Sequence, residues 1–381
     1  MNIAFLAGYA PSLARLRGPL LRAMSAAGHR VTALAPDDDP RARHELARLG
    51  VDFQAIPLRR AGLNPLADLG TLAALRRALG RLSPDLVLSS SAKAVIWGSL
   101  AARQAGVPRV FALITGLGRA FFLERERPGL GRRVLNLAAR ALYRRSLPAC
   151  HGLLFQNQDD HHLFQRLGLL RPGQAALVTA GSGVDLEHFT PAEPVLPDPV
   201  EGGPVFLTLT RMLLAKGLPE FAAAARTLKA RYPAAEFRAC GPLETGPGAV
   251  SRARLAAWAR EGAVTFVPAV DDVRPELRRA SVVVLASAYR EGLPHSLLEA
   301  LAMARPVVTT DVPGCCETVV PGRNGFLVPP RDADALAKAM ERFILDPGRI
   351  ADMGAAGRAL AEERFDVRTV NAQILEFLGL G

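Results

Sequence analysis

The sequence predicts an α/β protein with two Rossmann-like domains, and three observations support this fold class. Short aliphatic runs alternate along the chain with longer segments whose apolar residues recur at helical spacing, as in parallel strands covered by helices. The alternation stops at a proline- and glycine-rich stretch, residues 190–204, and then begins again. Because such folds bind ligands beyond the carboxyl ends of their strands, we expect a central cleft between the domains.

The first half of the chain contains five aliphatic runs of strand length. The predicted strands cover residues 3–7, 31–35, 86–89, 110–114 and 153–156. The predicted helices, each with an apolar stripe, cover residues 13–27, 64–82, 92–105, 132–147 and 159–167. We assign these elements to an N-terminal domain, residues 1–190.

The second half repeats the pattern after a predicted linker, residues 191–203. The predicted strands cover residues 205–209, 236–239, 264–267, 282–286 and 307–309, with helices between them. We assign them to a C-terminal domain, residues 204–365. A last helical segment, residues 366–381, is expected to pack back on the N-terminal domain.

The composition is that of a globular protein, with 49% hydrophobic and 22% charged residues. No apolar run approaches the roughly 20 residues that span a bilayer. The chain starts with apolar residues and no basic segment before them, which indicates a core strand rather than a signal peptide. Its four cysteines show neither metal-ligand spacing nor a disulfide pattern. We therefore expect a cytoplasmic location.

Basic residues are concentrated in the first half. Residues 1–190 contain 25 lysines and arginines against 13 acidic residues, whereas residues 191–381 contain 22 against 23. Eight of these arginines lie within residues 119–145, beside apolar residues at 121–123. This combination suits an anionic membrane surface. Nucleic acid is disfavoured, because no nucleic-acid-binding motif accompanies the arginines. A general arginine bias is the alternative, since only four of the 47 basic residues are lysine.

Glu291 and Glu299 lie on either side of a predicted helix start. Glu291 is in the loop after the predicted strand 282–286, and Pro294 marks the first helical turn, where its missing N–H is tolerated. Glu299 lies about one and a half turns into the helix. The helix N-terminus suits an anion, and the two carboxylates can accept hydrogen bonds from hydroxyl groups, so a sugar nucleotide fits. The alternative is that both glutamates are solvated surface charges.

Arg211 and Lys216 follow the predicted strand 205–209 and open the next helix. Two cations beside a helix N-terminus, at the carboxyl end of a strand, can neutralise a pyrophosphate. Taken singly, each would more often be a surface charge. Their position at the same predicted sheet edge as Glu291 favours a binding site.

Several motifs resemble those of family 4 retaining glycosyltransferases of the GT-B fold, and the resemblance covers the whole chain. The motifs are Thr115-Gly-Leu-Gly118, Gln156-Asn157-Asp159-Asp160, Gly181-Ser-Gly-Val-Asp185, Thr210-Arg-Met-Leu-Leu-Ala-Lys-Gly217, the Glu291/Glu299 pair, Val312-Pro-Gly-Cys-Cys-Glu317 and Asn324-Gly-Phe-Leu-Val-Pro-Pro330. More narrowly, Lys93, residues 115–118 and the proline-glycine-cysteine turn resemble bacterial enzymes that add a hexose or N-acetylhexosamine, such as N-acetylgalactosamine, to an undecaprenyl-diphosphate-linked sugar.

The resemblance implies a role for each matching residue. Arg211 and Lys216 would bind the donor diphosphate and support departure of UDP, Glu291 would contact the transferred sugar, and Glu299 would bind the ribose. The other donor-binding positions would be Gly8, Gly241, Val270, Gly292, Leu293, Pro294 and His295. The acceptor would be bound by Arg17, Lys93, Thr115, Gly116 and Gly118.

The resemblance further implies a retaining, metal-independent transferase without a cofactor, which moves sugar from a UDP-sugar to a polyprenyl-diphosphate-linked saccharide for O-antigen, capsule or N-glycan precursors. It would work on the inner face of the cell membrane. Because no carboxylate is an obvious nucleophile, we expect front-face attack, in which the leaving phosphate helps to deprotonate the acceptor hydroxyl. The run at residues 37–39 lacks Asp-x-Asp metal spacing and is interpreted as a solvated turn.

The chain departs from the family pattern at four places. Ala215 replaces a frequent acidic residue, residues 241–248 replace a Gly-Asp-Gly element, and His295 and Cys316 stand where basic residues are common. These departures leave the donor sugar open. The alternatives are another lipid or soluble acceptor, or a non-catalytic nucleotide-sugar-binding protein of the same fold. Presence of both cations together with both glutamates argues against the non-catalytic protein.

Overall fold

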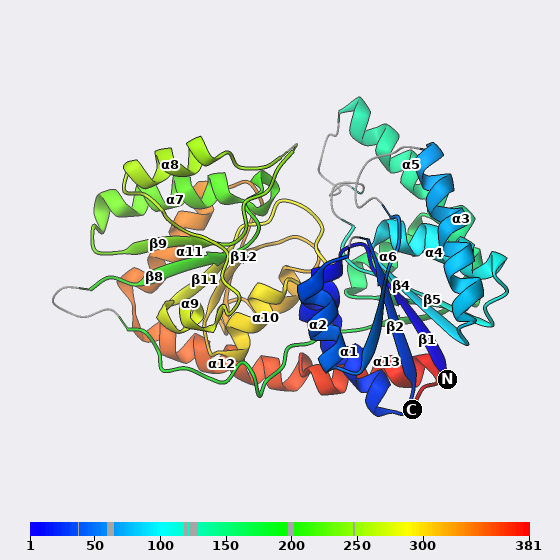
Figure 1. Cartoon of the computed structure of the whole chain (residues 1–381). Helices are drawn as coiled ribbons and strands as arrows, with labels where there is room; N and C mark the ends of the chain where they lie inside the picture. Colours follow the sequence, from blue (N-terminus) through cyan, green and yellow to red (C-terminus); the bar gives the residue numbers. More distant parts are fainter. Residues whose placement is uncertain (37, 59–64, 118–120, 122–128, 197–201, 247) are drawn as a thin grey trace. The chain divides into compact units, whose positions relative to one another are not determined.

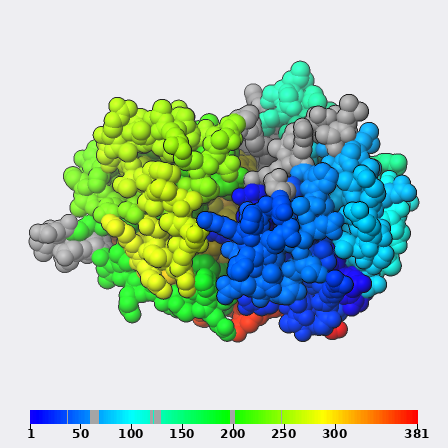
Figure 2. Space-filling model, in the orientation of Figure 1, coloured from blue at the N-terminus to red at the C-terminus, as the bar shows by residue number. Residues whose placement is uncertain are grey.

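The structure, a computed structural model, describes residues 1–36, 38–58, 65–117, 121, 129–196, 202–246 and 248–381. The chain forms two compact units, which we describe separately (Figure 1). Unit 1 consists of Met1–Ser182 and Val367–Gly381, and unit 2 of Gly183–Asp366. Figure 2 shows the side chains of the same residues in space-filling form, with the colours of Figure 1. No helix within the described ranges is long and apolar enough to cross a membrane.

Unit 1 is built on a parallel sheet whose described strands follow the order β3-β2-β1-β4-β5-β6-β7. The strands are β1 (Asn2–Leu6), β2 (Arg30–Ala35), β3 (Val51–Ala55), β4 (Leu86–Ser90), β5 (Arg109–Ile114), β6 (Gly152–Phe155) and β7 (Ala175–Val178). β1 and β4 are neighbours at the centre, where the strand order reverses. Their carboxyl ends therefore lie side by side, at the position where Rossmann-like sheets bind ligands.

Helices cover both faces of this sheet. They are α1 (Ala10–Ala26), α2 (Pro40–Arg48), α3 (Pro65–Leu82), α4 (Ala92–Gln104), α5 (Leu130–Ser146), the short η1 (Leu147–Ala149), α6 (Gln158–Arg166) and α13 (Val367–Leu378). One hydrophobic cluster joins the sheet to α1, α2 and α13, and a second joins it to α3, α4, α5 and α6. Unit 1 is thus a three-layer α/β/α sandwich, as the alternating pattern predicts.

Unit 2 repeats this architecture on a second parallel sheet, whose described strands follow the order β10-β9-β8-β11-β12-β13. The strands are β8 (Val205–Leu209), β9 (Glu236–Cys240), β10 (Thr265–Val267), β11 (Val282–Leu285), β12 (Val307–Thr310) and β13 (Gly325–Val328). Its helices are η2 (Leu214–Lys216), α7 (Leu218–Arg231), α8 (Arg252–Arg260), α9 (Arg274–Arg279), α10 (His295–Ala302), η3 (Cys316–Thr318), α11 (Ala333–Leu345) and α12 (Gly348–Arg364). The order again reverses between β8 and β11, which places their carboxyl ends next to each other.

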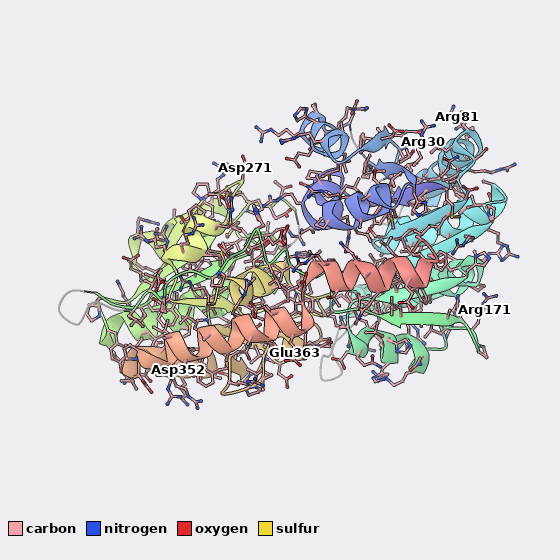
Figure 3. The ribbon with its side chains drawn as sticks, turned by 90° about the horizontal axis from the view of Figure 1, so that it is seen from below. Arg30, Arg81, Arg171, Asp271, Asp352 and Glu363 are labelled. Carbon is pink, nitrogen blue, oxygen red and sulfur yellow. The ribbon has the colours of Figure 1, made fainter. Side chains whose placement is uncertain are left out.

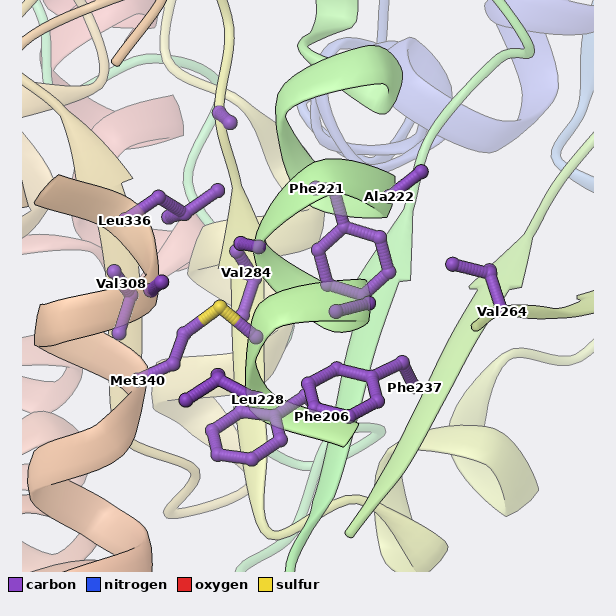
Figure 4. Close-up of a cluster of buried hydrophobic side chains, with 14 of the residues drawn as sticks. Phe206, Phe221, Ala222, Leu228, Phe237, Val264, Val284, Val308, Leu336 and Met340 are labelled. Carbon is purple, nitrogen blue, oxygen red and sulfur yellow. The ribbon is translucent and has the colours of Figure 1, made fainter. Parts of the chain in front are cut away.

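The core of unit 2 is a cluster of aromatic and aliphatic side chains between the sheet and its helices (Figure 4). Phe206 and Phe237 stack with ring centroids 5.3 Å apart, and Phe221 from α7 meets Phe237 edge to face. Met340 from α11 is fully buried in the same cluster. Burial of these side chains stabilises each by about 1.5–3 kcal/mol relative to exposure, which fixes α7 and α11 on the sheet.

The predicted strands and helices of both halves are present, with ends that shift by a few residues. The sequence analysis missed β3, β7, β13 and α2. β3 and β7 are edge strands whose residues, apart from Val51, are exposed or half-buried, so they lack a buried aliphatic run. α2 is mostly polar, but Asp39 caps it by accepting hydrogen bonds from two backbone N–H groups, and Pro40 is its first residue.

The division between the units differs from the boundary expected at residue 190. It falls between Ser182 and Gly183, because the following residues are bound to unit 2. The Val184 N–H donates to the Phe365 carbonyl oxygen at 2.7 Å, and Arg358 on α12 donates to carbonyl oxygens of this segment. The chain returns to unit 1 after Asp366, and α13 packs against α1.

Candidate functional site

Charged side chains of both units mostly lie on the outside. Figure 3 shows this for Arg30, Arg81, Arg171, Asp271, Asp352 and Glu363, all of which are exposed. Three cations that the sequence analysis singled out are different, because Lys216, Lys93 and Arg17 are largely buried. A buried charge is costly unless a partner compensates it, so the surroundings of these cations show what each position is built for.

Lys216 is brought to the site by a tight turn after β8. η2 ends at Lys216, and the next residue, Gly217, has a φ of 77° in the left-handed region, directly before the start of α7. A Cβ at Gly217 would overlap the carbonyl oxygen of Ala286, at the end of β11, so this approach requires glycine. The Ala288 N–H also donates to the Ala215 carbonyl oxygen at 2.8 Å. The turn after β8 therefore lies directly against the loop after β11.

Lys216 and Glu291 form a buried ion pair across these two loops. The Lys216 Nζ lies 2.6 Å from the Glu291 Oε1, and the side chains are 13% and 12% exposed. Ser287 Oγ donates to the same oxygen at 2.7 Å, and the Tyr289 ring centroid lies 5.3 Å from Nζ. Burial alone would lower the pKa of Lys216, but the charge of Glu291 and the hydrogen bond to it raise that pKa above its ordinary value. Lys216 is thus a fixed positive charge.

Arg211 forms a second, more exposed ion pair at the same sheet edge. Its Nη1 donates to the Glu244 Oε1 at 3.0 Å, and the side chains are 41% and 24% exposed. Glu244 belongs to the loop after β9, the strand next to β8. Both cations predicted to bind a diphosphate are therefore bound to carboxylates of neighbouring loops.

Gly241 and Val270 follow β9 and β10, which are adjacent strands. Gly241 has a φ of 151°, and a Cβ there would overlap the Thr210 carbonyl oxygen, so the loops after β8 and β9 are in close contact. Val270 is half-buried, and its backbone binds the Cys240 thiol by a hydrogen bond. Burial raises the pKa of that thiol to about 11. The two positions line one continuous edge with Arg211.

α10 begins at His295, directly after Pro294, as the sequence analysis expects. Leu293 and Pro294 are buried, whereas Gly292, His295 and Glu299 are half-buried. The polar residues His295 and Glu299 are thus partly accessible, and both belong to the first turns of α10. Buried leucines on the other side of α10 fix the helix against the sheet.

The proline-glycine-cysteine turn packs on the loop that carries Glu291. The Glu291 N–H donates to the Pro313 carbonyl oxygen at 3.1 Å, and a Cβ at Gly314 would overlap the Gly292 carbonyl oxygen. Cys315 is buried, and this burial raises the pKa of its thiol above the ordinary value. Cys316 is half-buried next to this contact.

In unit 1, Gly8 follows β1 and is so close to Ser91 that a Cβ would overlap the serine Oγ. Arg17, on α1, is 8% exposed. Its Nη1 donates to Ser182 Oγ, which also accepts a hydrogen bond from Gln156 Nε2 at 2.8 Å. Burial lowers the pKa of Arg17 to about 10. A buried guanidinium held by a neutral hydroxyl is the kind of position that an anionic ligand would stabilise.

Lys93, on α4, forms an ion pair with Asp68, on α3. The Lys93 Nζ lies 2.8 Å from the Asp68 Oδ1, and the side chains are 16% and 6% exposed. Thr115 and Gly116 follow β5 directly and are half-buried. Gly118 lies outside the described residues.

The structure thus brings the predicted second-half residues to one edge of the unit 2 sheet. The sequence analysis missed their partners, Ser287, Tyr289 and Glu244, and also Asp68. Ser287 and Tyr289 had a local signal, because they belong to the same loop as Glu291. Glu244 and Asp68 had none, since Glu244 reaches Arg211 through the adjacency of β8 and β9, and Asp68 reaches Lys93 through the packing of α3 on α4.

These features define a protein of two Rossmann-like units with a site suited to an anionic, hydroxyl-bearing ligand. The family model of glycosyl transferases group 1 matches residues 203–346, and that of the glycosyl transferase 4-like domain matches residues 14–181. The chain belongs to this glycosyltransferase family, and the resemblance inferred from its motifs is confirmed.

Several relatives match over most of their length. The chain is 28% identical over 354 residues to the N,N'-diacetylbacillosaminyl-diphospho-undecaprenol alpha-1,3-N-acetylgalactosaminyltransferase of Campylobacter jejuni, covering 91% of this chain and 90% of that protein. It is 30% identical over 362 residues to the alpha-maltose-1-phosphate synthase of Mycolicibacterium smegmatis, covering 86% of this chain and 89% of that protein.

Among solved structures, the chain is similar to Anabaena HepE in complex with UDP and glucose. The TM-score is 0.77 at 19% sequence identity, and the match covers 100% of this chain and 99% of HepE. This likeness confirms the fold: the protein is a glycosyltransferase of the GT-B type.

Proposed function

We propose that the protein is a retaining, metal-independent glycosyltransferase that moves a hexose or N-acetylhexosamine from a UDP-sugar to a polyprenyl-diphosphate-linked saccharide. The Lys216–Glu291 pair carries this proposal, because it fixes a cation and a carboxylate at the carboxyl edge of the unit 2 sheet. The Campylobacter relative, whose name states an undecaprenyl-diphosphate acceptor, supports the acceptor class. The HepE complexes with UDP and with UDP-glucose support the donor class.

The charges of the site suit departure of a nucleoside diphosphate. As the glycosidic bond to the diphosphate breaks, negative charge grows on the leaving phosphate oxygen. Lys216 and Arg211 can stabilise this charge without moving far, because their side chains are already positioned by neighbouring loops. Glu291 is bound through one oxygen to Lys216 and Ser287, which suits hydrogen bonding to a sugar hydroxyl better than nucleophilic attack. This arrangement supports front-face attack by the acceptor hydroxyl.

The acceptor side is proposed to lie in unit 1. Arg17 provides a buried positive charge, and Lys93, Thr115 and Gly116 follow the carboxyl ends of β4 and β5. Among the described residues, Arg17 donates to a neutral hydroxyl, so an acceptor that carries a diphosphate would supply a compensating anion. We therefore assign Arg17 to the acceptor diphosphate.

α5 supports a membrane-bound acceptor. Leu130, Val134 and Leu137 recur at helical spacing and are 79%, 54% and 62% exposed. Arg144 and Arg145, also exposed, follow on the last turn of the helix. An exposed apolar stripe beside arginines suits shallow insertion into an anionic membrane, so we propose peripheral association with the inner face of the cell membrane. The arginines and apolar residues at 119, 122, 123, 125 and 127 lie outside the described residues, whereas Phe121, expected to be exposed beside the arginines, is buried against Tyr143 and Phe164.

The membrane proposal predicts a loss of liposome binding. Replacing Leu130, Val134 and Leu137 together by serine should weaken sedimentation with vesicles that contain anionic lipid, by about tenfold or more. Neutral phosphatidylcholine vesicles are the control lipid, and circular dichroism checks that the variant is folded. Equal sedimentation of wild type and variant would contradict a role of α5 in membrane binding.

The proposed reaction is tested with a panel of UDP- and GDP-sugars and a bacterial membrane extract as acceptor. Mass spectrometry should show one hexose or N-acetylhexosamine added to a polyprenyl-diphosphate-linked saccharide, with the anomeric configuration retained. Activity that survives in excess EDTA is expected. Transfer only to a soluble acceptor would contradict the acceptor class. Tight UDP binding without transfer or donor hydrolysis would instead indicate a non-catalytic binding protein.

A further inference from the structure

Both predicted diphosphate cations are neutralised within unit 2. Lys216 pairs with Glu291, and Arg211 pairs with Glu244, so these four side chains together carry no net charge. A nucleoside diphosphate carries at least two negative charges. It gains little from a neutral cluster unless one cation exchanges its carboxylate for a phosphate.

The two pairs differ in how easily such an exchange can occur. The Lys216–Glu291 pair is almost buried, and Ser287 also binds Glu291. Separating it would leave a buried charge without compensation, which is strongly unfavourable. The Arg211–Glu244 pair is partly open to solvent and has one hydrogen bond of 3.0 Å between its side chains. Water can replace either partner there at small cost. Arg211 is therefore the cation that exchanges.

Glu244 is held near Arg211 by the backbone of its own loop. The Met212 N–H donates to the Pro242 carbonyl oxygen at 2.9 Å, and the Leu214 N–H donates to the Gly248 carbonyl oxygen at 2.8 Å. The two accepting residues, Pro242 and Gly248, lie before and after Glu244 in the chain. The loop after β9 thus runs along the segment that contains Arg211, and the carboxylate stays within reach after its hydrogen bond is broken.

We propose that Glu244 is a positioning residue. Its carboxylate holds Arg211 until the donor diphosphate displaces that carboxylate, and it binds Arg211 again when the nucleoside diphosphate leaves. The proposal rests on the proposed function, since it assumes that Arg211 binds the diphosphate. Residues 241–248, the loop that differs from the Gly-Asp-Gly element of the family, would then act in release of the product rather than in recognition of the base. The carboxylate competes with phosphate, so it weakens binding of UDP and speeds its release.

The test is calorimetric titration of the full chain with UDP and, separately, with uridine. Glu244→Gln keeps the size of the side chain but removes its charge, and it should lower the Kd for UDP about three- to tenfold while leaving the Kd for uridine unchanged. In steady-state assays, the KM for the donor should fall and kcat should fall with it, because product leaves more slowly. A merely structural role of Glu244 would raise KM instead.

Three further variants make the result specific. Glu244→Asp, which keeps the charge, should restore the KM and Kd towards those of wild type. Glu261→Gln removes a carboxylate from an exposed pair with Arg226 elsewhere in unit 2 and should change neither constant. In an Arg211→Gln background, Glu244→Gln should have no effect on UDP binding.

An unchanged or higher Kd for UDP in Glu244→Gln, with wild-type binding intact, would overturn this proposal and leave the proposed function standing. A wild-type protein that binds no UDP would contradict both.

Discussion

Arg211 in unit 2 and Arg17 in unit 1 differ in the partners of their positive charges, whereas Lys93 of unit 1 is paired with Asp68 as the cations of unit 2 are with carboxylates. In unit 2, Lys216 and Arg211 are each paired with a carboxylate. In unit 1, Arg17 is more deeply buried than Arg211, but its hydrogen-bond partner is the neutral hydroxyl of Ser182. A ligand of unit 2 must therefore exchange partners, whereas an anion at Arg17 adds a missing charge. Under the proposed function, the donor diphosphate therefore exchanges with a carboxylate in unit 2, whereas the acceptor anion would compensate the charge of Arg17 in unit 1.

Breaking the buried pair of unit 2 should have the largest effect. Lys216→Met is expected to reduce transfer about 100- to 1,000-fold, because the charge on the leaving phosphate loses a fixed cation. It should also destabilise the protein by about 3–5 kcal/mol, since Glu291 becomes a buried charge without its cation. Urea unfolding and donor turnover measure the two losses separately.

The double variant Lys216→Met with Glu291→Leu is the control for that experiment. It removes both charges, so most of the stability should return while transfer stays low. Recovered transfer in the double variant would show that the loss in Lys216→Met came from unfolding alone.

Removing the charge of Arg17 in unit 1 should separate stability from activity in the opposite way. Arg17→Met deletes a buried guanidinium whose pKa is lowered to about 10 by burial, so the melting temperature should stay the same or rise. The KM for a polyprenyl-diphosphate acceptor should rise about tenfold, with the KM for the donor unchanged. A lower melting temperature with unchanged acceptor KM would show that Arg17 is a structural residue.

The smallest expected effect is the pH dependence of the Lys216–Glu291 pair. Because the pKa of Lys216 is raised in the folded protein, its contribution to stability is complete below the unfolded pKa of about 10.4 and is lost as pH rises through the folded pKa. The difference in unfolding free energy between wild type and Lys216→Met should thus stay constant from about pH 7 to 9 and decrease above about pH 10. A decrease already at pH 8 would contradict a raised pKa.

The sequence predicts the fold well wherever a strand is buried on both faces, as β8 and β11 are, because a run of aliphatic residues is then required. It fails at edge strands such as β7, whose residues are exposed or half-buried, so that a run of aliphatic residues is not required. The polar helix α2 was missed although Asp39 and Pro40 together are a helix-start signal.

For the candidate site, the sequence predicts which residues lie at the edge of each sheet but not how they pair. Lys216 and Glu291 were both singled out, yet as separate contacts to phosphate and sugar. Their ion pair depends on the approach of Gly217 to Ala286, which joins distant parts of the chain. Glu244 was missed for the same reason, since its contact with Arg211 follows from the adjacency of β8 and β9.

The path of the chain through unit 1 has a consequence for biosynthesis. Residues of α13 such as Val370, Ile374 and Leu378 are buried in the hydrophobic cluster of β1 and α1, and the Phe377 ring meets Phe111 edge to face. Unit 2 is one continuous stretch of chain, whereas unit 1 needs these late residues. On the ribosome, we therefore expect unit 2 to reach its native state first, because the apolar face of unit 1 stays uncovered until α13 has been synthesised.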